Sequence, residues 1–229
     1  MKIYQVLILF FICCLPAKLL AETKPAKPIP AANLTHQYVP SLVGLRIALV
    51  VNQTSTINQI HLVDSLRSLG IHIEKIFAPE HGFRGNIDAG ETVLSSIDSL
   101  TCISIVSLYG DHKKPTKEDL QNCDLVLFDI QDVGVRFYTY LSTLHLVMEA
   151  CAENSLPLMV LDRPNPNGSY IDGPVLDTSK FKSFVGMHPV PIVYGMTIGE
   201  YAKMINGEHW LNNQLKCNLT VIPVAAYDH

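Results

Sequence analysis

An acidic residue and a histidine directly follow one of the apolar runs of this sequence. Glu80 and His81 stand in a stiff turn between Pro79 and Gly82, immediately after the run 71–77. If that run is a strand of a parallel sheet, its end faces the edge where ligands bind. A carboxyl group placed there can donate and accept a proton, as glycoside hydrolysis requires. We predict Glu80 to be a catalytic residue, and the alternative is a solvated surface turn.

Two further acids are predicted to complete the catalytic set. Glu91 follows Glu80 by eleven residues, and Asp129 lies within the apolar run 125–130. Glu91 also suits the first turn of a helix, where the helix dipole favours a negative charge. Asp129 either faces the crevice at the strand ends or caps the following helix. The residue pattern leaves these alternatives open.

The residues predicted to bind a substrate come from the same group of loops. Arg136 could hold a carboxylate in a fork geometry or pair with Asp132, and Tyr138 could stack on a sugar ring or pack in the core. Asp162 and Arg163 could brace their loop as an ion pair, and the asparagines could form turns. The predicted set is Asn52, His81, Arg84, Asp132, Arg136, Tyr138, Asp162, Arg163, Asn165 and Asn167.

Short apolar runs alternate with helical periods from residue 45 onward. Strands are expected over 45–51, 71–77, 102–108, 125–130, 158–161, 191–194 and 219–222, and helices over 59–69, 141–152 and 198–205. Such alternation predicts an α/β fold with a mostly parallel sheet flanked by helices. Right-handed crossovers then bring the carboxyl ends of the strands to one edge. The polar groups described above should meet at that edge.

Missing motifs exclude several classes of function. The sequence has no GxGxxG after the first strand, no P-loop and no GxSxG elbow. Dinucleotide binding, P-loop nucleotide chemistry and the α/β-type serine hydrolases are therefore disfavoured. Without HExxH or a two-Cys, two-His pattern, no metal and no other cofactor is expected. The formal net charge is −4 and no Lys/Arg-rich block occurs, so no nucleic-acid partner is expected.

The N-terminus has the pattern of an export signal. Lys2 supplies a basic start, the apolar run 6–15 follows, and residues 19–21 (LLA) end in a small residue. The run is shorter than the roughly 20 residues of a membrane span, so no stable span is expected after signal removal. A signal peptide over 1–21 implies a periplasmic or secreted protein. A lipoprotein is less expected, because large residues precede Cys13.

The rest of the chain is predicted to hold one linker and one domain. Residues 22–40 contain four prolines and predict an extended linker, and residues 41–229 predict the folded domain. A chain of 229 residues with 48% hydrophobic content suffices for one α/β domain. Cys102, Cys123, Cys151 and Cys217 fit no zinc or CxxC pattern. Export makes a disulfide possible, but buried free thiols are favoured for Cys102 and Cys151.

Six stretches resemble one known family when they are taken together and in order. APEHGFRG, AGE, SLYG, DIQDVGVRFYTY, LDRPNPNG with DGP, and GMTIGEYAKMI are similar to the NamZ-like exo-β-N-acetylmuramidase family, formerly a domain of unknown function (DUF1343). The resemblance covers roughly residues 42–229. It implies a Rossmann-like N-terminal domain, a smaller C-terminal domain and an active site in the cleft between them.

The resemblance also implies a reaction. Members release N-acetylmuramic acid from the non-reducing ends of peptidoglycan fragments, so muropeptides or disaccharides derived from peptidoglycan are the expected partners. Glu80 of the PEHGF motif is the implied acid/base. The family continues well beyond the stretch resembled by 221–229, so these residues alone should have weak or no activity and an exposed apolar docking face. The alternative function is a non-catalytic glycan-binding protein of the cell envelope.

Overall fold

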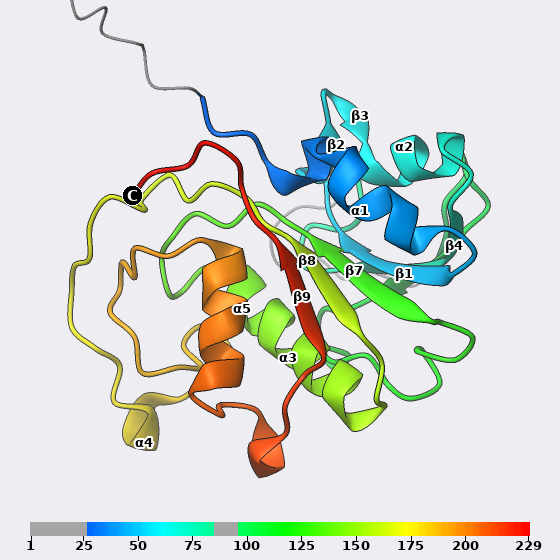
Figure 1. The fold of residues 1–229 in the computed structure, drawn as a ribbon. Coiled ribbons are helices and arrows are strands. Elements are labelled where there is room, and N and C mark those ends of the chain that lie inside the picture. Colours follow the sequence, from blue (N-terminus) through cyan, green and yellow to red (C-terminus); the bar gives the residue numbers. More distant parts are fainter. Residues whose placement is uncertain (1–26, 85–95) are drawn as a thin grey trace, which may run out of the picture.

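The computed structural model describes residues 27–84 and 96–229, which form a seven-stranded sheet with helices on both faces (Figure 1). The predicted signal peptide and Glu91 lie outside the described residues. The sheet contains β1 (Arg46–Val51), β4 (His72–Ala78), β5 (Ser96–Ile97), β6 (Ser104–Ser107), β7 (Leu125–Asp129), β8 (Leu158–Leu161) and β9 (Leu219–Ile222). A separate two-stranded sheet joins β2 (Thr56–Ile57) to β3 (Ile60–His61).

The helices complete the list of elements. They are η1 (Ala31–Asn33), α1 (Thr35–Leu42), α2 (Leu62–Ser68), α3 (Tyr140–Glu153), α4 (Thr178–Phe181), α5 (Ile198–Gly207) and η2 (Asn212–Gln214). In the described part of the chain, none of them has the length and apolar character of a membrane span.

The order of the strands is that of a doubly wound sheet. The order is β5-β6-β4-β1-β7-β8-β9, and every pair is parallel except β5 with β6. Without the short edge strand β5, the six parallel strands run 3-2-1-4-5-6 in chain order, which is the Rossmann order. The predicted α/β fold with a mostly parallel sheet is confirmed. The topological switch point lies between β1 and β7.

Both faces of the sheet are covered, which explains why its strands are continuously apolar. Ile47, Leu49 and Val51 of β1 belong to one core cluster, and Ala48 and Val50 belong to the other. The first cluster includes residues of α1 and α2, and the second includes residues of α3 and α5 (Figure 1). Successive side chains of a strand point to opposite faces, so a strand buried on both faces must be apolar throughout.

The expected linker over 22–40 is wrong for its second half. Residues 35–42 form α1, and the side chains of Tyr38 and Leu42 are wholly buried. The hydroxyl of Tyr38 donates to the carbonyl of Ala32 at 2.9 Å and ties the helix to η1. Tyr38 and Leu42 are one helical turn apart and form an apolar stripe that proline content concealed.

Two other predictions at the level of single elements are corrected. Residues 191–194 form no strand, because Val193 makes only isolated bridges to Val135 and Asp172. Cys102 is exposed at a positive φ of 59°, since the chain turns there and β6 begins two residues later. Cys151 is buried as expected, and all four described cysteines are free thiols.

Large apolar side chains are exposed on the segment between β8 and α5. Ile171, Val175, Phe181 and Val185 have exposed fractions of 53% or more. The apolar docking face for a further domain stays a prediction.

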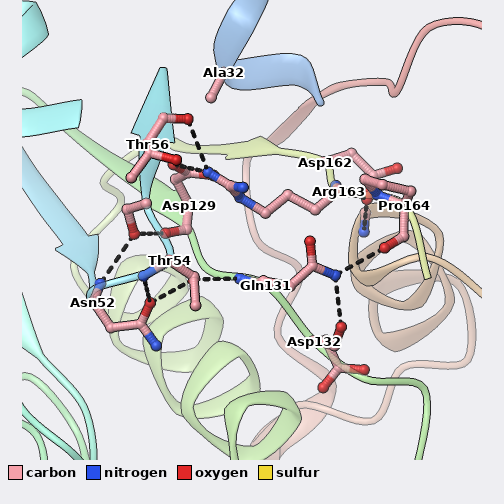
Figure 2. Close-up of polar contacts among 12 residues, drawn as sticks. Ala32, Asn52, Thr54, Thr56, Asp129, Gln131, Asp132, Asp162, Arg163 and Pro164 are labelled. Atoms are coloured by element: carbon pink, nitrogen blue, oxygen red, sulfur yellow. Dashed lines mark hydrogen bonds and ion pairs between the residues drawn. The ribbon is translucent and has the colours of Figure 1, made fainter. Parts of the chain in front are cut away.

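A buried ion pair fastens the carboxyl ends of two central strands. The guanidinium of Arg163, which follows β8, reaches Asp129 at the end of β7 with Nε–Oδ1 and Nη2–Oδ2 distances of 2.6 and 2.8 Å (Figure 2). Asp129 is 0% exposed and Arg163 is 6% exposed. Nη2 also donates to the carbonyl of Thr56, and the hydroxyl of Ser55 donates to the carbonyl of Asp129. The pair therefore joins β7, β8 and the β2–β3 sheet.

Breaking this pair should destabilise the fold strongly. Arg163→Met leaves the Asp129 carboxylate buried without a counter-charge, which should lower the free energy of unfolding by about 3–5 kcal/mol. The matched control is Arg46→Met, which breaks the ion pair between Arg46 and Asp124. The two side chains are 43% and 34% exposed, respectively. That change should cost much less, because water and salt screen an exposed ion pair. Urea unfolding measures both, and equal costs would contradict the prediction.

A pair of buried histidines lies in the helical layer that covers the α3 side of the sheet. Nε2 of His188 is 2.9 Å from Nδ1 of His145, and Nδ1 of His188 is 3.1 Å from the Tyr201 hydroxyl. Trp210 stacks on His188 with ring centroids 4.7 Å apart. Burial is the main cause that lowers the pKa of His145 to about 4 and of His188 to about 3. The folded protein therefore holds both rings neutral.

This pair should make the fold sensitive to acid. Unfolded histidines titrate near 6.5, so between pH 6.5 and about 4 the unfolded chain binds more protons and stability falls as pH decreases. At pH 5 the loss should be about 2 kcal/mol for each histidine. Urea unfolding at pH 7.5 and 5.0 tests this. The double variant His145→Leu, His188→Phe should lose less stability between the two pH values, and an unchanged loss would refute the assignment.

Candidate active site

The loops that follow the parallel strands meet at one edge of the sheet and carry most of the predicted site residues. Asn52 follows β1, Glu80 follows β4, Tyr109 comes two residues after β6, and Gln131 comes two residues after β7. This is the carboxyl edge, where ligands of doubly wound sheets bind beside the switch point. The structure thus brings together polar groups that are far apart in the sequence.

Glu80 is held by side chains from two other elements. The hydroxyl of Thr139, the N-cap residue of α3, donates to Oε2 of Glu80 at 3.1 Å. Tyr109 contacts the same carboxylate, and the negative charge of Glu80 is the main cause that raises the pKa of Tyr109. His81 has a positive φ of 70° and Gly82 one of 74°. A non-glycine residue in this region stores backbone strain, which is common at functional sites.

Two buried polar groups lie close to Glu80 without full hydrogen bonds. Asn52 is 0% exposed, and its Oδ1 accepts from the backbone N–H and the hydroxyl of Thr54 at 2.9 and 2.6 Å. Among the described residues, Nδ2 of Asn52 and the hydroxyl of Tyr140 lack a hydrogen bond of normal geometry. The Asn52 amide and the charge of Glu80 nevertheless both act on the pKa of Tyr140, so these groups are neighbours. Unsatisfied buried groups at such an edge are able to bind a ligand.

Tyr138 lies beside this group. Its ring meets that of Tyr140 edge-on, with centroids 4.8 Å apart, and it is half-buried. Tyr138 also packs against the core cluster that contains Tyr140, which agrees with the packing interpretation, and stacking on a sugar stays a prediction.

Asp129 is not a free catalytic carboxylate, because its two oxygens are bound to Arg163 and it is wholly buried. The prediction of a catalytic Asp129 is corrected accordingly. Arg163 pairs with Asp129 and not with the side chain of its neighbour Asp162. Asp162 instead accepts from the Thr197 hydroxyl and the Gly199 N–H, both at 2.7 Å, at the start of α5. Both residues position loops.

The other two predicted arginines are also engaged within the chain. Arg84 binds the carboxylates of Asp64 and Asp98, with closest distances of 3.1 Å to each. Arg136 donates through Nη1 to the carbonyls of Pro174 and Val190 at 2.9 and 2.5 Å. The alternative pair of Arg136 with Asp132 is therefore not formed.

Asp132 is buried at a place where its charge is poorly compensated. Its Oδ2 accepts from the Tyr194 hydroxyl and, at 2.7 Å, from the Gly134 N–H. Its Oδ1 has no partner among the described residues. Burial is the main cause that raises the pKa of Asp132 to about 6.

Asn165 and Asn167 form the turn that their sequence context allows. Nδ2 of Asn165 donates to the Met196 carbonyl and its Oδ1 accepts from the Asn167 N–H, both at 2.8 Å. Nδ2 of Asn167 donates to the Val133 carbonyl at 2.8 Å. The turn-forming interpretation of these two residues is confirmed.

Sequence reasoning missed Tyr109 and Thr139. Tyr109 is the tyrosine of the SLYG stretch, which the pattern analysis used only for family resemblance. Thr139 stands two residues before the predicted helix 141–152 and is the residue type expected at an N-cap. Within residues 27–84 and 96–229, no group of three His, Cys, Asp or Glu side chains is placed to hold a metal ion.

The comparisons with known proteins agree with this fold. Residues 47–229 match the family model for the exo-beta-N-acetylmuramidase NamZ, N-terminal. The chain is 45% identical over 202 residues to the peptidoglycan beta-N-acetylmuramidase NamZ of Bacillus subtilis (strain 168), covering 87% of this chain and 48% of that protein.

Two crystal structures of DUF1343 family proteins from Bacteroides fragilis NCTC 9343 are also similar. One has a TM-score of 0.81 and 46% identity, covering 89% of this chain and 54% of the other. The second has a TM-score of 0.80 and 36% identity, covering 88% and 51%. The chain spans about half the length of these relatives. On the match across its whole sheet, the chain belongs to the NamZ exo-β-N-acetylmuramidase family.

Proposed function

We propose that this chain supplies the catalytic acid/base of an exo-acting glycoside hydrolase that releases N-acetylmuramic acid from the non-reducing ends of peptidoglycan fragments. The observation that carries the proposal is the placement of Glu80 at the carboxyl edge of the sheet, with Thr139 donating to its carboxylate. The name of the B. subtilis relative supports the substrate class. Residues 41–229 would then form the Rossmann-like catalytic part of a longer family architecture.

In the proposed reaction, Glu80 protonates the oxygen that leaves with the rest of the glycan. Thr139 and Tyr109 hold its carboxyl group in place through the contacts described above. The unsatisfied groups of Asn52 and Tyr140 are suited to bind hydroxyl or carbonyl groups of the sugar. Because Asp129 is engaged with Arg163, Glu91 is the remaining predicted candidate for the second carboxylate that this chemistry needs.

Replacing Glu80 should abolish turnover and spare binding. Glu80→Gln keeps the shape and cannot exchange a proton, so kcat for a chromogenic β-N-acetylmuraminide should fall by about 10²–10⁴-fold in the complete protein. Glu118→Gln, an exposed acid elsewhere, is the matched control and should behave like wild type.

Two outcomes would contradict this proposal. Glu80→Gln with wild-type kcat would remove Glu80 from the mechanism. A wild-type protein that binds muropeptides without turning them over would support the glycan-binding alternative, which the engagement of Asp129 with Arg163 keeps in view.

We also propose that the protein is exported by a signal peptide over residues 1–21. Deletion of residues 2–21 should then leave the protein in the cytoplasm, while the intact chain reaches the periplasm or the medium without its signal. Cell fractionation with mass spectrometry of the mature N-terminus measures this. An intact N-terminus on exported protein would contradict cleavage after Ala21.

A further inference from the structure

A hollow of about 480 Å³ lies beside the switch point, on the side of β7 and β8. Its lining includes Pro28, Gln131, Asp132, Pro164, Asn165 and Tyr227. None of these residues contacts Glu80 in the interactions described above. The hollow is therefore a separate feature of the same sheet edge.

Gln131 lines the hollow and is held in place by three hydrogen bonds. Its backbone N–H donates to the Thr54 hydroxyl at 3.0 Å, and its Nε2 donates to the carbonyls of Asp132 and Pro164 at 2.7 and 2.8 Å. Figure 2 shows the amide oxygen of Gln131 turned away from these contacts, with no donor to it among the described residues. This fixed oxygen is ready to accept a hydrogen bond from a ligand.

Asp132 belongs to the same lining, but its carboxylate does not face the same way as the free oxygen of Gln131. Figure 2 shows the carboxylate oxygens of Asp132 on the opposite side from the amide oxygen of Gln131. Its Oδ2 accepts from Tyr194 and Gly134, and its Oδ1 is closed to solvent. The hydrogen-bonding group of the hollow is therefore the Gln131 oxygen, which suits a ligand that donates a hydrogen bond.

The walls of the hollow are apolar rings. Pro28 and Pro164 contribute their rings, and Tyr227 contributes a phenol whose hydroxyl donates to the Asn165 carbonyl at 3.0 Å. Any side chain at Gly168, the glycine of LDRPNPNG, would collide with that hydroxyl. The absence of a side chain at Gly168 therefore leaves room for the hydroxyl of Tyr227. A site that combines apolar rings with a fixed hydrogen-bond acceptor suits a sugar, because a sugar has an apolar face and hydroxyl donors around its edge.

The position of the hollow relates it to Glu80. Glu80 follows β4 and Gln131 follows β7, and only β1 lies between these strands. At about 4.8 Å per strand, the two strands are separated by about 10 Å. Asn52 and Thr54 connect the two places, since Thr54 bonds to both Asn52 and Gln131. Glu80 and the hollow therefore lie at neighbouring places along one edge of the sheet.

We propose that the hollow binds the sugar ring on the leaving-group side of the scissile bond, an N-acetylhexosamine with free hydroxyl groups. The proposal rests on the proposed glycosidase function and adds the site that holds the second ring. Tyr227 and the proline rings contact its apolar face, while the free amide oxygen of Gln131 accepts from one of its hydroxyl or amide donors.

The test compares two substrates that differ only in the leaving group. One is the disaccharide N-acetylmuramyl-N-acetylglucosamine, and the other is N-acetylmuramyl β-fluoride, whose leaving group has no ring. In the complete protein, Tyr227→Ala should lower kcat/KM for the disaccharide by about tenfold or more and for the fluoride by less than about twofold. Val43→Ala, exposed at the end of α1, is the off-site control.

A second variant protects the test against misfolding. Pro166→Trp places a large side chain at the exposed rim and should fill the hollow, with the same selective loss on the disaccharide. Equal losses on both substrates, or no loss on either, in variants with wild-type thermal unfolding would overturn the proposal. Failure of the wild-type protein to hydrolyse either substrate would instead overturn the proposed function.

Discussion

The structure depends on one buried ion pair, between Asp129 and Arg163, at the carboxyl ends of β7 and β8. Two charges withdrawn from water are tolerated only when each is the partner of the other, so their geometry dictates how these strand ends lie. The same contacts place Gln131 and Pro164, the residues two and one positions further along, within hydrogen-bonding distance of each other. Asp129, which was predicted to be catalytic, and Arg163, which was predicted to bind substrate, therefore form the frame beside which the proposed sugar-binding hollow lies.

Much of the scaffold could be predicted because its signals are local. A strand buried on both faces is an unbroken apolar run, and β1, β7 and β8 are recognisable on that ground alone. The position of Glu80 followed from the strand before it and from the rule that parallel strands share a ligand-binding edge. Helix α1 was missed because its burial depends on Tyr38 and Leu42 packing on a distant sheet, while the prolines of residues 22–40 indicated a linker.

The partners of the charged residues could not be predicted, since each pairing joins segments far apart in the chain. Arg163 bonds to Asp129, which is 34 residues away in the sequence, and Arg136 bonds to the Val190 carbonyl, which is 54 residues away. Residue type limits what such a group can bond, but only the fold decides which donor and acceptor meet. His188 illustrates the same limit: it stands in a loop without partner spacing, yet the packing of α3 and α5 places it against His145.

Because these acids and arginines are bound to each other or to the backbone, fewer charged groups at the carboxyl edge are available for catalysis. When the acids and arginines that are bound within the chain are set aside, Glu80 stands beside the hydroxyls of Tyr109 and Thr139 and the unsatisfied amide of Asn52. Those neighbours are neutral hydrogen-bonding groups, whereas both oxygens of Asp129 are bound to a buried guanidinium. A general acid must present its carboxyl group to the substrate, and a carboxylate engaged like that of Asp129 does not. In the proposed reaction, the fold thus separates two uses of the same residue type: the carboxylate of Asp129 is bound within the edge, and that of Glu80 is left for proton transfer.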